Sequence, residues 1–135
     1  MKRSPWLGVF LCFLAAVPAT AHHSLAVYNR LSSKTIVGTV QSFSWSNPHV
    51  RLDLMASGAG GAVIHWSFEA GSVNRLAMAG FNRNIVAPGD KITVTYNPKR
   101  DGSNAGFLLS ITNANGRKFD TRRNRGPTRG GAEEG

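Results

Sequence analysis

The chain breaks into short segments in which apolar and polar residues alternate, and this pattern most restricts the fold it can adopt. Alternation with a period of two is typical of a β-strand that rests one face on a core. Residues rich in Gly, Pro, Asn and Asp separate the segments and favour turns. The pattern predicts strands over residues 35–45, 50–55, 62–69, 91–97 and 106–112.

In two of these strands the alternation also predicts which side chains face the core. The strand over 35–45 places four residues on one face: Ile36, Gly38, Val40 and Ser42. Its internal glycine predicts a bulge or a sharp bend. The strand over 62–69 has a buried side marked by bulky residues, Ile64, Trp66 and Phe68, so that His65 is expected to point the opposite way.

One segment has helical spacing in place of alternation. Ser72 can cap a short helix that runs to about Ala79, and Gly80 can end it. The order is then three strands, a short helix and two strands. This order predicts a mainly β fold, a small five-stranded OB-like Greek-key barrel with one short helix between strands 3 and 4. A seven-stranded sandwich needs more strands than the sequence offers.

The first 21 residues have the three regions of an export signal. Lys2 and Arg3 form the positive start, an apolar run follows from Trp6 to Val17, and small residues lead to a cleavage site after Ala21. The apolar run is too short to span a bilayer, which takes about 20 residues. We therefore expect a Sec-type signal peptide over 1–21, no transmembrane anchor after processing, and a periplasmic or secreted protein.

The remainder divides into a barrel domain over 22–119, including an N-terminal arm, and a tail over 120–135. The tail is rich in Arg and Gly with almost no apolar residues, so we expect it to be disordered. The formal net charge of the chain is +9. Outside the cytoplasm, a basic chain favours an anionic envelope component or a protein partner, although a merely solvated tail explains the same composition.

A metal site in the processed chain would need nitrogen and oxygen ligands. The single cysteine, Cys12, lies in the predicted signal, so neither a disulfide nor a thiolate site is expected after cleavage. The sulfur atoms of Met55 and Met78 are the remaining soft donors.

The histidines are the candidate metal ligands. Cleavage after Ala21 would leave His22 with a free α-amino group, and an amine with an imidazole on one residue can chelate copper(II). His23 follows directly, and His49 ends the turn after the first predicted barrel strand. His22, His23 and His49 have the ingredients of a T-shaped histidine-brace site, and His65 is an additional candidate. Copper is expected ahead of zinc or nickel.

Alternative roles remain open for each of these residues. His22 and His23 can be solvent-exposed polar residues, His49 can hydrogen-bond within its turn, and His65 can lie on a wet sheet face. Glu69 can act as an extra metal ligand, and an ion pair with Arg75 or Arg51 is the favoured role for it.

Several enzyme classes lack support in the sequence. It contains no Gly-x-Ser-x-Gly, no catalytic cysteine, no His-Glu-x-x-His and no phosphate-cradling glycine motif. A hydrolytic enzyme is not expected, and no catalytic residue is nominated.

Aromatic residues on an OB-like barrel can form a stacking platform for single-stranded nucleic acid. Alternation directs most of these side chains into the core, and the export signal removes nucleic acid from reach. No nucleic-acid partner is therefore expected. These aromatic residues are Phe43, Trp45, Trp66, Phe68 and Tyr96.

Seven short motifs together resemble one family of small exported bacterial proteins, catalogued as a domain of unknown function. They are AHHS at 21–24, GTV at 38–40, WSNPHV at 45–50, WSFE at 66–69, LAMAGF at 76–81, PGD at 88–90 and DGS at 101–103. The resemblance covers roughly residues 22–119 and implies an exported single-domain protein without supplying an activity.

Only some of the candidate ligands lie at positions that belong to the family pattern. His22, His23 and His49 match positions of the family pattern, whereas His65 does not, and the arginine-rich tail lies outside it. Asn29 stands where the family usually has an acidic residue.

The leading hypothesis is an exported OB-like barrel that binds a copper-type divalent ion through His22, His23 and His49, for binding, delivery or sensing and not for turnover. The competing hypothesis is a metal-free envelope interaction module that uses the barrel face or the basic tail. A third hypothesis is an oxidative copper enzyme.

Overall fold

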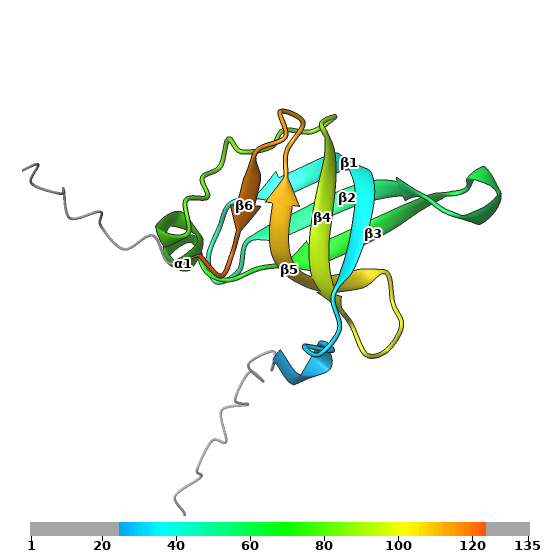
Figure 1. Cartoon of the computed structure of the whole chain (residues 1–135), viewed down its shortest axis with the longest axis horizontal. Coiled ribbons are helices and arrows are strands. Elements are labelled where there is room, and N and C mark those ends of the chain that lie inside the picture. The colour runs from blue at the N-terminus through cyan, green and yellow to red at the C-terminus, as the bar shows by residue number, and fades with distance from the viewer. Residues whose placement is uncertain (1–24, 124–135) are drawn as a thin grey trace, which may run out of the picture.

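The predicted alternation produces the strands of a closed barrel in the computed structural model, which describes residues 25–123 (Figure 1). Two 3₁₀ turns, η1 and η2, and one α-helix, α1, accompany six strands. In chain order the elements are η1 (Leu25–Val27), β1 (Lys34–Ser44), β2 (Arg51–Ser57), η2 (Ala59–Gly61), β3 (Val63–Glu69), α1 (Val73–Met78), β4 (Lys91–Pro98), β5 (Ala105–Thr112) and β6 (Lys118–Asp120).

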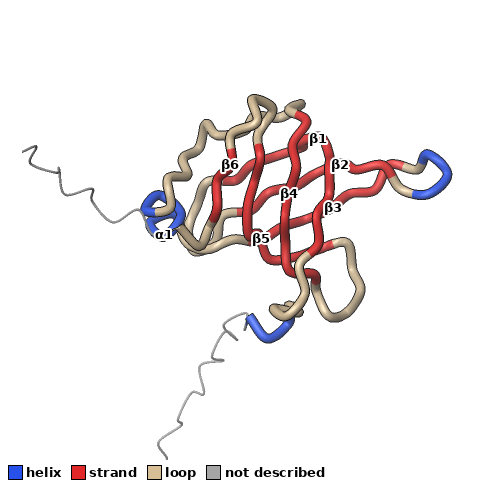
Figure 2. Tube along the Cα trace, in the orientation of Figure 1, coloured by secondary structure: helices blue, strands red, loops and turns tan. Residues whose placement is uncertain are grey.

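Strand pairing closes the sheet on itself. Neighbouring strands follow the order β3-β2-β1-β4-β5-β6, all antiparallel, and β3 also pairs with β5 in parallel (Figure 2). Strands β1 to β5 therefore form a five-stranded OB-like barrel, with α1 between β3 and β4. The predicted fold is confirmed, including the position of its helix. Ser72 caps α1 by accepting a hydrogen bond from the backbone N–H of Arg75, at 3.4 Å.

The core is made by the inward residues of the alternating strands. Its fully buried side chains come from several segments of the barrel: Val50, Leu52, Leu54, Phe68, Leu76, Ile92, Val94, Leu108 and Ile111. In β3, Phe68 is fully buried, Ile64 and Trp66 are partly buried, and His65 is exposed, as the alternation predicted.

One prediction for the first strand is wrong, because Ser42 does not share the inward face of Val40. The register of β1 against β2 shifts between Val40 and Ser42, so Ser42 lies opposite Asp53 and Phe43 lies opposite the buried Leu52. This bulge turns Ser42 away from the core face that Val40 occupies. Gly38 is not at the bulge; a Cβ there would lie 2.9 Å from the Met55 carbonyl oxygen, so close packing against β2 requires glycine.

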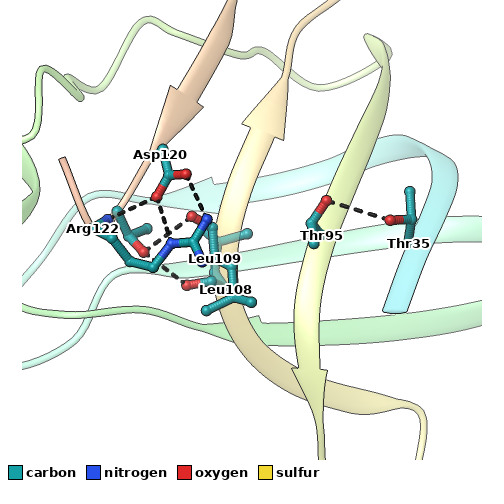
Figure 3. A network of polar contacts seen from close by, with 7 residues as sticks. Thr35, Thr95, Leu108, Leu109, Asp120 and Arg122 are labelled. Carbon is teal, nitrogen blue, oxygen red and sulfur yellow. Dashed lines mark hydrogen bonds and ion pairs between the residues drawn. The ribbon is translucent and has the colours of Figure 1, made fainter. Parts of the chain in front are cut away.

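A sixth strand, β6, was not predicted from the sequence. It adds to the outer edge of β5 and buries Phe119, over which the Arg117 guanidinium lies at 4.9 Å from the ring centroid. Contacts continue past the predicted boundary at 119, because the buried Thr121 hydroxyl donates to the carbonyl oxygens of Leu108 and Leu109 at 3.3 and 3.0 Å (Figure 3). The hydroxyl oxygens of Thr35 on β1 and Thr95 on β4 lie 3.4 Å apart, and a dashed line joins these two side chains in the same view.

The predicted export signal over 1–21 and the tail beyond Arg123 lie outside the described residues, and both stay predictions. Between residues 25 and 123, no helix has the length and apolar character needed to cross a membrane.

The burial of Leu108 supplies a stability test with a matched control. Leu108 is fully buried on β5, whereas Leu31 is 98 % exposed. Leu108→Ala should lower the free energy of unfolding by about 2–5 kcal/mol, because it removes buried methyl groups and leaves a cavity. Leu31→Ala should change it by less than about 0.5 kcal/mol. Urea denaturation measures both, and an equal effect of the two substitutions would contradict the described core.

Candidate functional site

A pocket of about 590 Å³ lies outside the barrel core, beside β5. Phe107 and Leu109 line it and alternate along β5 with the buried Leu108, so they face away from the core. The other walls come from the N-terminal arm, the turn before β2, the end of β3, the start of α1 and the residues that follow β6. Segments from both ends of the described chain therefore meet at one place.

Barrel closure positions the polar side chains of this pocket. Glu69 lies opposite Phe107 in the parallel pairing of β3 with β5. The ladder between β2 and β3 continues beyond both strands, since the Ala70 N–H donates to the Val50 carbonyl at 2.8 Å and the Val50 N–H donates to the Gly71 carbonyl at 3.1 Å. His49 is thereby a diagonal cross-strand neighbour of Glu69 on the same face of the sheet.

The Glu69 carboxylate joins two side chains from distant parts of the chain. Its Oε1 lies 2.7 Å from Nδ1 of His49, and its Oε2 accepts a hydrogen bond from the Tyr28 hydroxyl at 2.9 Å. Both carboxylate oxygens are therefore engaged. Tyr28 is almost completely buried, and its ring packs at 5.6 Å from that of Phe107.

The arm that carries Tyr28 is tied to the loop between β4 and β5. Tyr28 forms an isolated bridge with Lys99, and the Asn29 N–H donates to the Pro98 carbonyl at 2.8 Å. The Arg100 guanidinium donates through Nε to the Ala26 carbonyl at 3.0 Å. These contacts hold the beginning of the described chain beside the pocket, which Leu25 also lines.

The contact with Glu69 determines what the His49 ring can offer. In the neutral ring, an Nδ1–H that donates to Glu69 leaves the lone pair on Nε2. The His49 side chain is 44 % exposed, and within residues 25–123 its Nε2 has no hydrogen-bond partner. The geometry thus provides an oriented imidazole nitrogen at the edge of a pocket.

Burial raises the pKa of Tyr28 well above its ordinary value, and the hydrogen bond to Glu69 and the charge of that carboxylate add to the increase. The phenol therefore stays protonated to a higher pH than an exposed tyrosine would, and it donates to Glu69 over that whole range. The interaction fixes one carboxylate oxygen and leaves the other for His49.

Three arginines line the same pocket. Arg122 is paired with Asp120 through two hydrogen bonds, Nε to Oδ1 at 3.0 Å and Nη2 to Oδ2 at 2.8 Å (Figure 3), and the pairing lowers the pKa of Asp120. Arg30 and Arg75 are exposed, and neither has a carboxylate oxygen within 4.0 Å among the residues described. The pocket therefore contains uncompensated guanidinium groups.

The structure brings together two of the predicted site residues, His49 and Glu69, and not the other candidates. His22 and His23 lie outside the described residues. His65 is four residues before Glu69 on β3, roughly 13 Å along the strand, and its Nε2 lies 3.4 Å from Asp53. Across residues 25–123, no group of three or more His, Cys, Asp or Glu side chains has the spacing to hold a metal ion.

The predicted ion pair of Glu69 with Arg75 or Arg51 is wrong. Arg51 lies opposite Glu69 in the β2–β3 register, yet the carboxylate bonds to His49 and Tyr28 instead. Burial of Tyr28 beside the strand end supplies a hydroxyl donor, which sequence spacing did not reveal.

A second polar cluster lies on the outer face of β1 to β3. Asp53 accepts a hydrogen bond from the Ser42 hydroxyl at 2.8 Å and contacts His65. The serine donates to the carboxylate and not to the histidine, so Ser42, His65 and Asp53 are not connected in the order of a Ser-His-Asp triad.

Sequence reasoning missed Tyr28, Arg30 and Arg75 as residues of the pocket. The unbroken apolar run at 107–109 was the available signal, because a half-buried strand would have placed a polar residue at 107 or 109. Outward apolar residues on β5 indicate that something covers this part of the strand.

Comparison with known families identifies the group to which the chain is related. A family model described as a family of unknown function (DUF6152) matches residues 11–109. The chain belongs to this family. The resemblance to a domain of unknown function is thus confirmed at the level of the family, and DUF6152 carries no described activity. No curated protein matches the chain.

Two solved structures match part of the chain. The mitochondrial single-stranded DNA-binding protein Rim1 of S. cerevisiae matches with a TM-score of 0.46 and 13 % identity, over 61 % of this chain and 92 % of Rim1. The N-terminal domain of PriB from Thermoanaerobacter tencongensis matches with a TM-score of 0.44 and 16 % identity, over 62 % of this chain and 96 % of that domain.

The tyrosines provide a test of the pocket's electrostatics. The chain has two, and burial raises the pKa of Tyr96 as well as that of Tyr28. In the folded protein neither should ionise at the ordinary value of about 10, whereas both should do so after unfolding. Ultraviolet absorbance of tyrosinate measures this, and Tyr28→Phe should leave only the transition of Tyr96.

The sign of the effect on stability follows from the same shifts. Above pH 10 the unfolded chain loses tyrosine protons that the folded chain retains, so the free energy of unfolding should decrease as pH rises. The decrease should be smaller in Tyr28→Phe. Ionisation of both tyrosines near pH 10 in the folded protein would contradict the buried contact of Tyr28 with Glu69.

Proposed function

We propose that this DUF6152 protein is an exported barrel that binds a copper-type divalent ion with His49 as a ligand, for binding or delivery and not for turnover. The 2.7 Å contact between His49 Nδ1 and Glu69 carries the proposal. Histidines that bind metals commonly donate the other ring N–H to a carboxylate, which fixes the ring and raises its basicity. His49 has such a partner and keeps Nε2 for the ion.

Glu69 acts in this proposal as the orienting carboxylate and not as a ligand. Its two oxygens already contact His49 and Tyr28. Direct coordination would require one of these contacts to break. The protonated Tyr28 stabilises the carboxylate in the position that His49 needs.

The remaining ligands are proposed to come from the predicted processed terminus. Leu25 lines the pocket together with His49, and His23 and His22 precede it by two and three residues. A residue spans at most about 3.6 Å, so the two histidines are tethered within roughly 7 and 11 Å of Leu25. Cleavage after Ala21 would add the His22 amine. Such a nitrogen-rich set favours copper over zinc or nickel.

A metal-free module that holds an anionic envelope component is the second candidate. The uncompensated guanidinium groups of Arg30 and Arg75 beside the pocket favour it.

Copper(II) titration with electron paramagnetic resonance tests the metal proposal on protein whose N-terminus is verified to be His22. We expect submicromolar binding and a spectrum with rigid nitrogen ligands. His49→Ala should weaken binding by at least about tenfold, as loss of one ligand removes 1.4 kcal/mol or more of binding free energy. His65→Ala is the matched control and should leave the affinity unchanged, since His65 contacts Asp53.

An added Met before His22 separates the intended site from adventitious binding at the terminus. It removes the His22 amine from the chelate, and the affinity should decrease together with a change in the spectrum. Equal affinity of the parent, the Met-extended form and His49→Ala would contradict the proposed site.

The orienting role of Glu69 predicts a distinct result. Glu69→Gln keeps the shape of the side chain and removes its charge, and should weaken copper binding by about 10–100-fold, the range for partners of metal-ligating histidines. The nitrogen-ligand spectrum should persist at saturating copper. Changed g and copper hyperfine values at saturation, with the nitrogen couplings retained, would instead identify Glu69 as a direct ligand.

A further inference from the structure

We propose that the pocket beside β5 binds a small organic carboxylate with an apolar body. This inference goes beyond metal binding and does not depend on it. It rests on the conjunction of guanidinium groups, outward apolar side chains and a suitable volume in one cavity.

The charge of the lining selects an anion. Among the lining residues of the described segment 25–123, Arg30, Arg75 and Arg122 stand against one carboxylate, that of Glu69. Asp120 offsets Arg122, and this still leaves two arginines against Glu69. Guanidinium groups present paired N–H donors that match the two oxygens of a carboxylate.

The internal contacts of Glu69 reduce its opposition to an incoming anion. Both oxygens face donors of the protein itself, His49 Nδ1 and the Tyr28 hydroxyl. The guanidinium groups of Arg30 and Arg75 have no such protein carboxylate within residues 25–123. Their charge is available to a ligand.

The apolar part of the lining selects the body of the ligand. Phe107 and Leu109 face outward from β5 and remain partly exposed, and Leu25 is 44 % exposed at the same pocket. Covering this surface with an apolar chain or ring removes it from water. A bare inorganic anion would leave these side chains uncovered.

The size of the cavity agrees with a small molecule. Its volume of about 590 Å³ lies within the usual range of roughly 300–1,000 Å³ for ligand pockets. The pocket is also bounded by elements that are held together: the arm through Pro98 and Arg100, and the C-terminal segment through Thr121.

Isothermal titration of the whole exported chain with octanoate tests the proposal, with a chelator present to remove metal ions. Octanol has the same apolar chain without the charge, and inorganic phosphate has the charge without the chain. Octanoate should bind at least about tenfold more tightly than either, because charge-assisted hydrogen bonds and apolar burial then act together. The chelator makes the result independent of copper binding.

Two variants and a control locate the site. Arg30→Gln and Arg75→Gln should each weaken octanoate binding by about tenfold, as expected for loss of a hydrogen bond to a charged group. Arg83→Gln removes an exposed guanidinium that does not line the pocket and should bind octanoate as the parent does. Circular dichroism and the urea midpoint establish that each variant is folded.

Three results would overturn the proposal. Octanol that binds as tightly as octanoate would mean that the arginines do not recognise the ligand. An equal loss of octanoate affinity in Arg83→Gln and Arg75→Gln would indicate a general effect of net charge and not recognition in the pocket. Absence of octanoate binding, together with Arg75-dependent sedimentation on phosphatidylglycerol vesicles but not on phosphatidylcholine vesicles, would assign the arginines to a membrane surface.

Discussion

The parallel pairing of β3 with β5 is the constraint on which the remainder of the molecule depends. It joins Ser67–Glu69 to residues 105–107, segments nearly forty positions apart, and converts a twisted sheet into a closed barrel. Glycine at 106 lets β4 pack closely against β5 at the same place, since a Cβ there would lie 2.4 Å from Cδ2 of Tyr96 and 2.8 Å from the Asn97 carbonyl oxygen, both on β4. Closure also places Glu69 beside Phe107, and so creates the wall on which the pocket is built.

The polar centre of the pocket follows from this arrangement and from the cost of burial. A carboxylate at the end of β3 needs partners when it leaves water, and it finds them in His49 and Tyr28. The Tyr28 phenol donates to Glu69, and burial raises its pKa, so that this hydrogen bond persists into alkaline pH. Tyr28 thereby ties the N-terminal arm to the barrel, and His49 directs its Nε2 atom outward. The two proposals use different groups of the same pocket. The metal ion would bind the Nε2 atom of His49, and the organic carboxylate would bind the neighbouring guanidinium groups.

Much of the fold was predictable because alternation directly reports which side of a strand meets the core. Leu52 and Leu54 are buried and Arg51 is exposed, as their spacing indicates. Ser42 was misplaced because a bulge changes the phase of alternation, and hydrophobic pattern cannot locate a bulge when glycine offers a more obvious position. Strand β6 escaped prediction because three residues carry too little periodicity, although Phe119 shows its buried side in the structure.

The amino-acid sequence alone was enough to predict the five barrel strands, most of their inward faces and the capped helix between the third and fourth strands, and it named the histidines as candidate ligands. These properties depend on neighbours along the chain, where side-chain period and turn residues act locally. Which of those residues contact one another depends on the three-dimensional fold. It brought His49 to Glu69, left His65 on Asp53, and recruited Tyr28, Arg30 and Arg75 to one pocket. The physical reason is that barrel closure and the docking of the arm bring together residues whose separation in sequence carries no periodic signal.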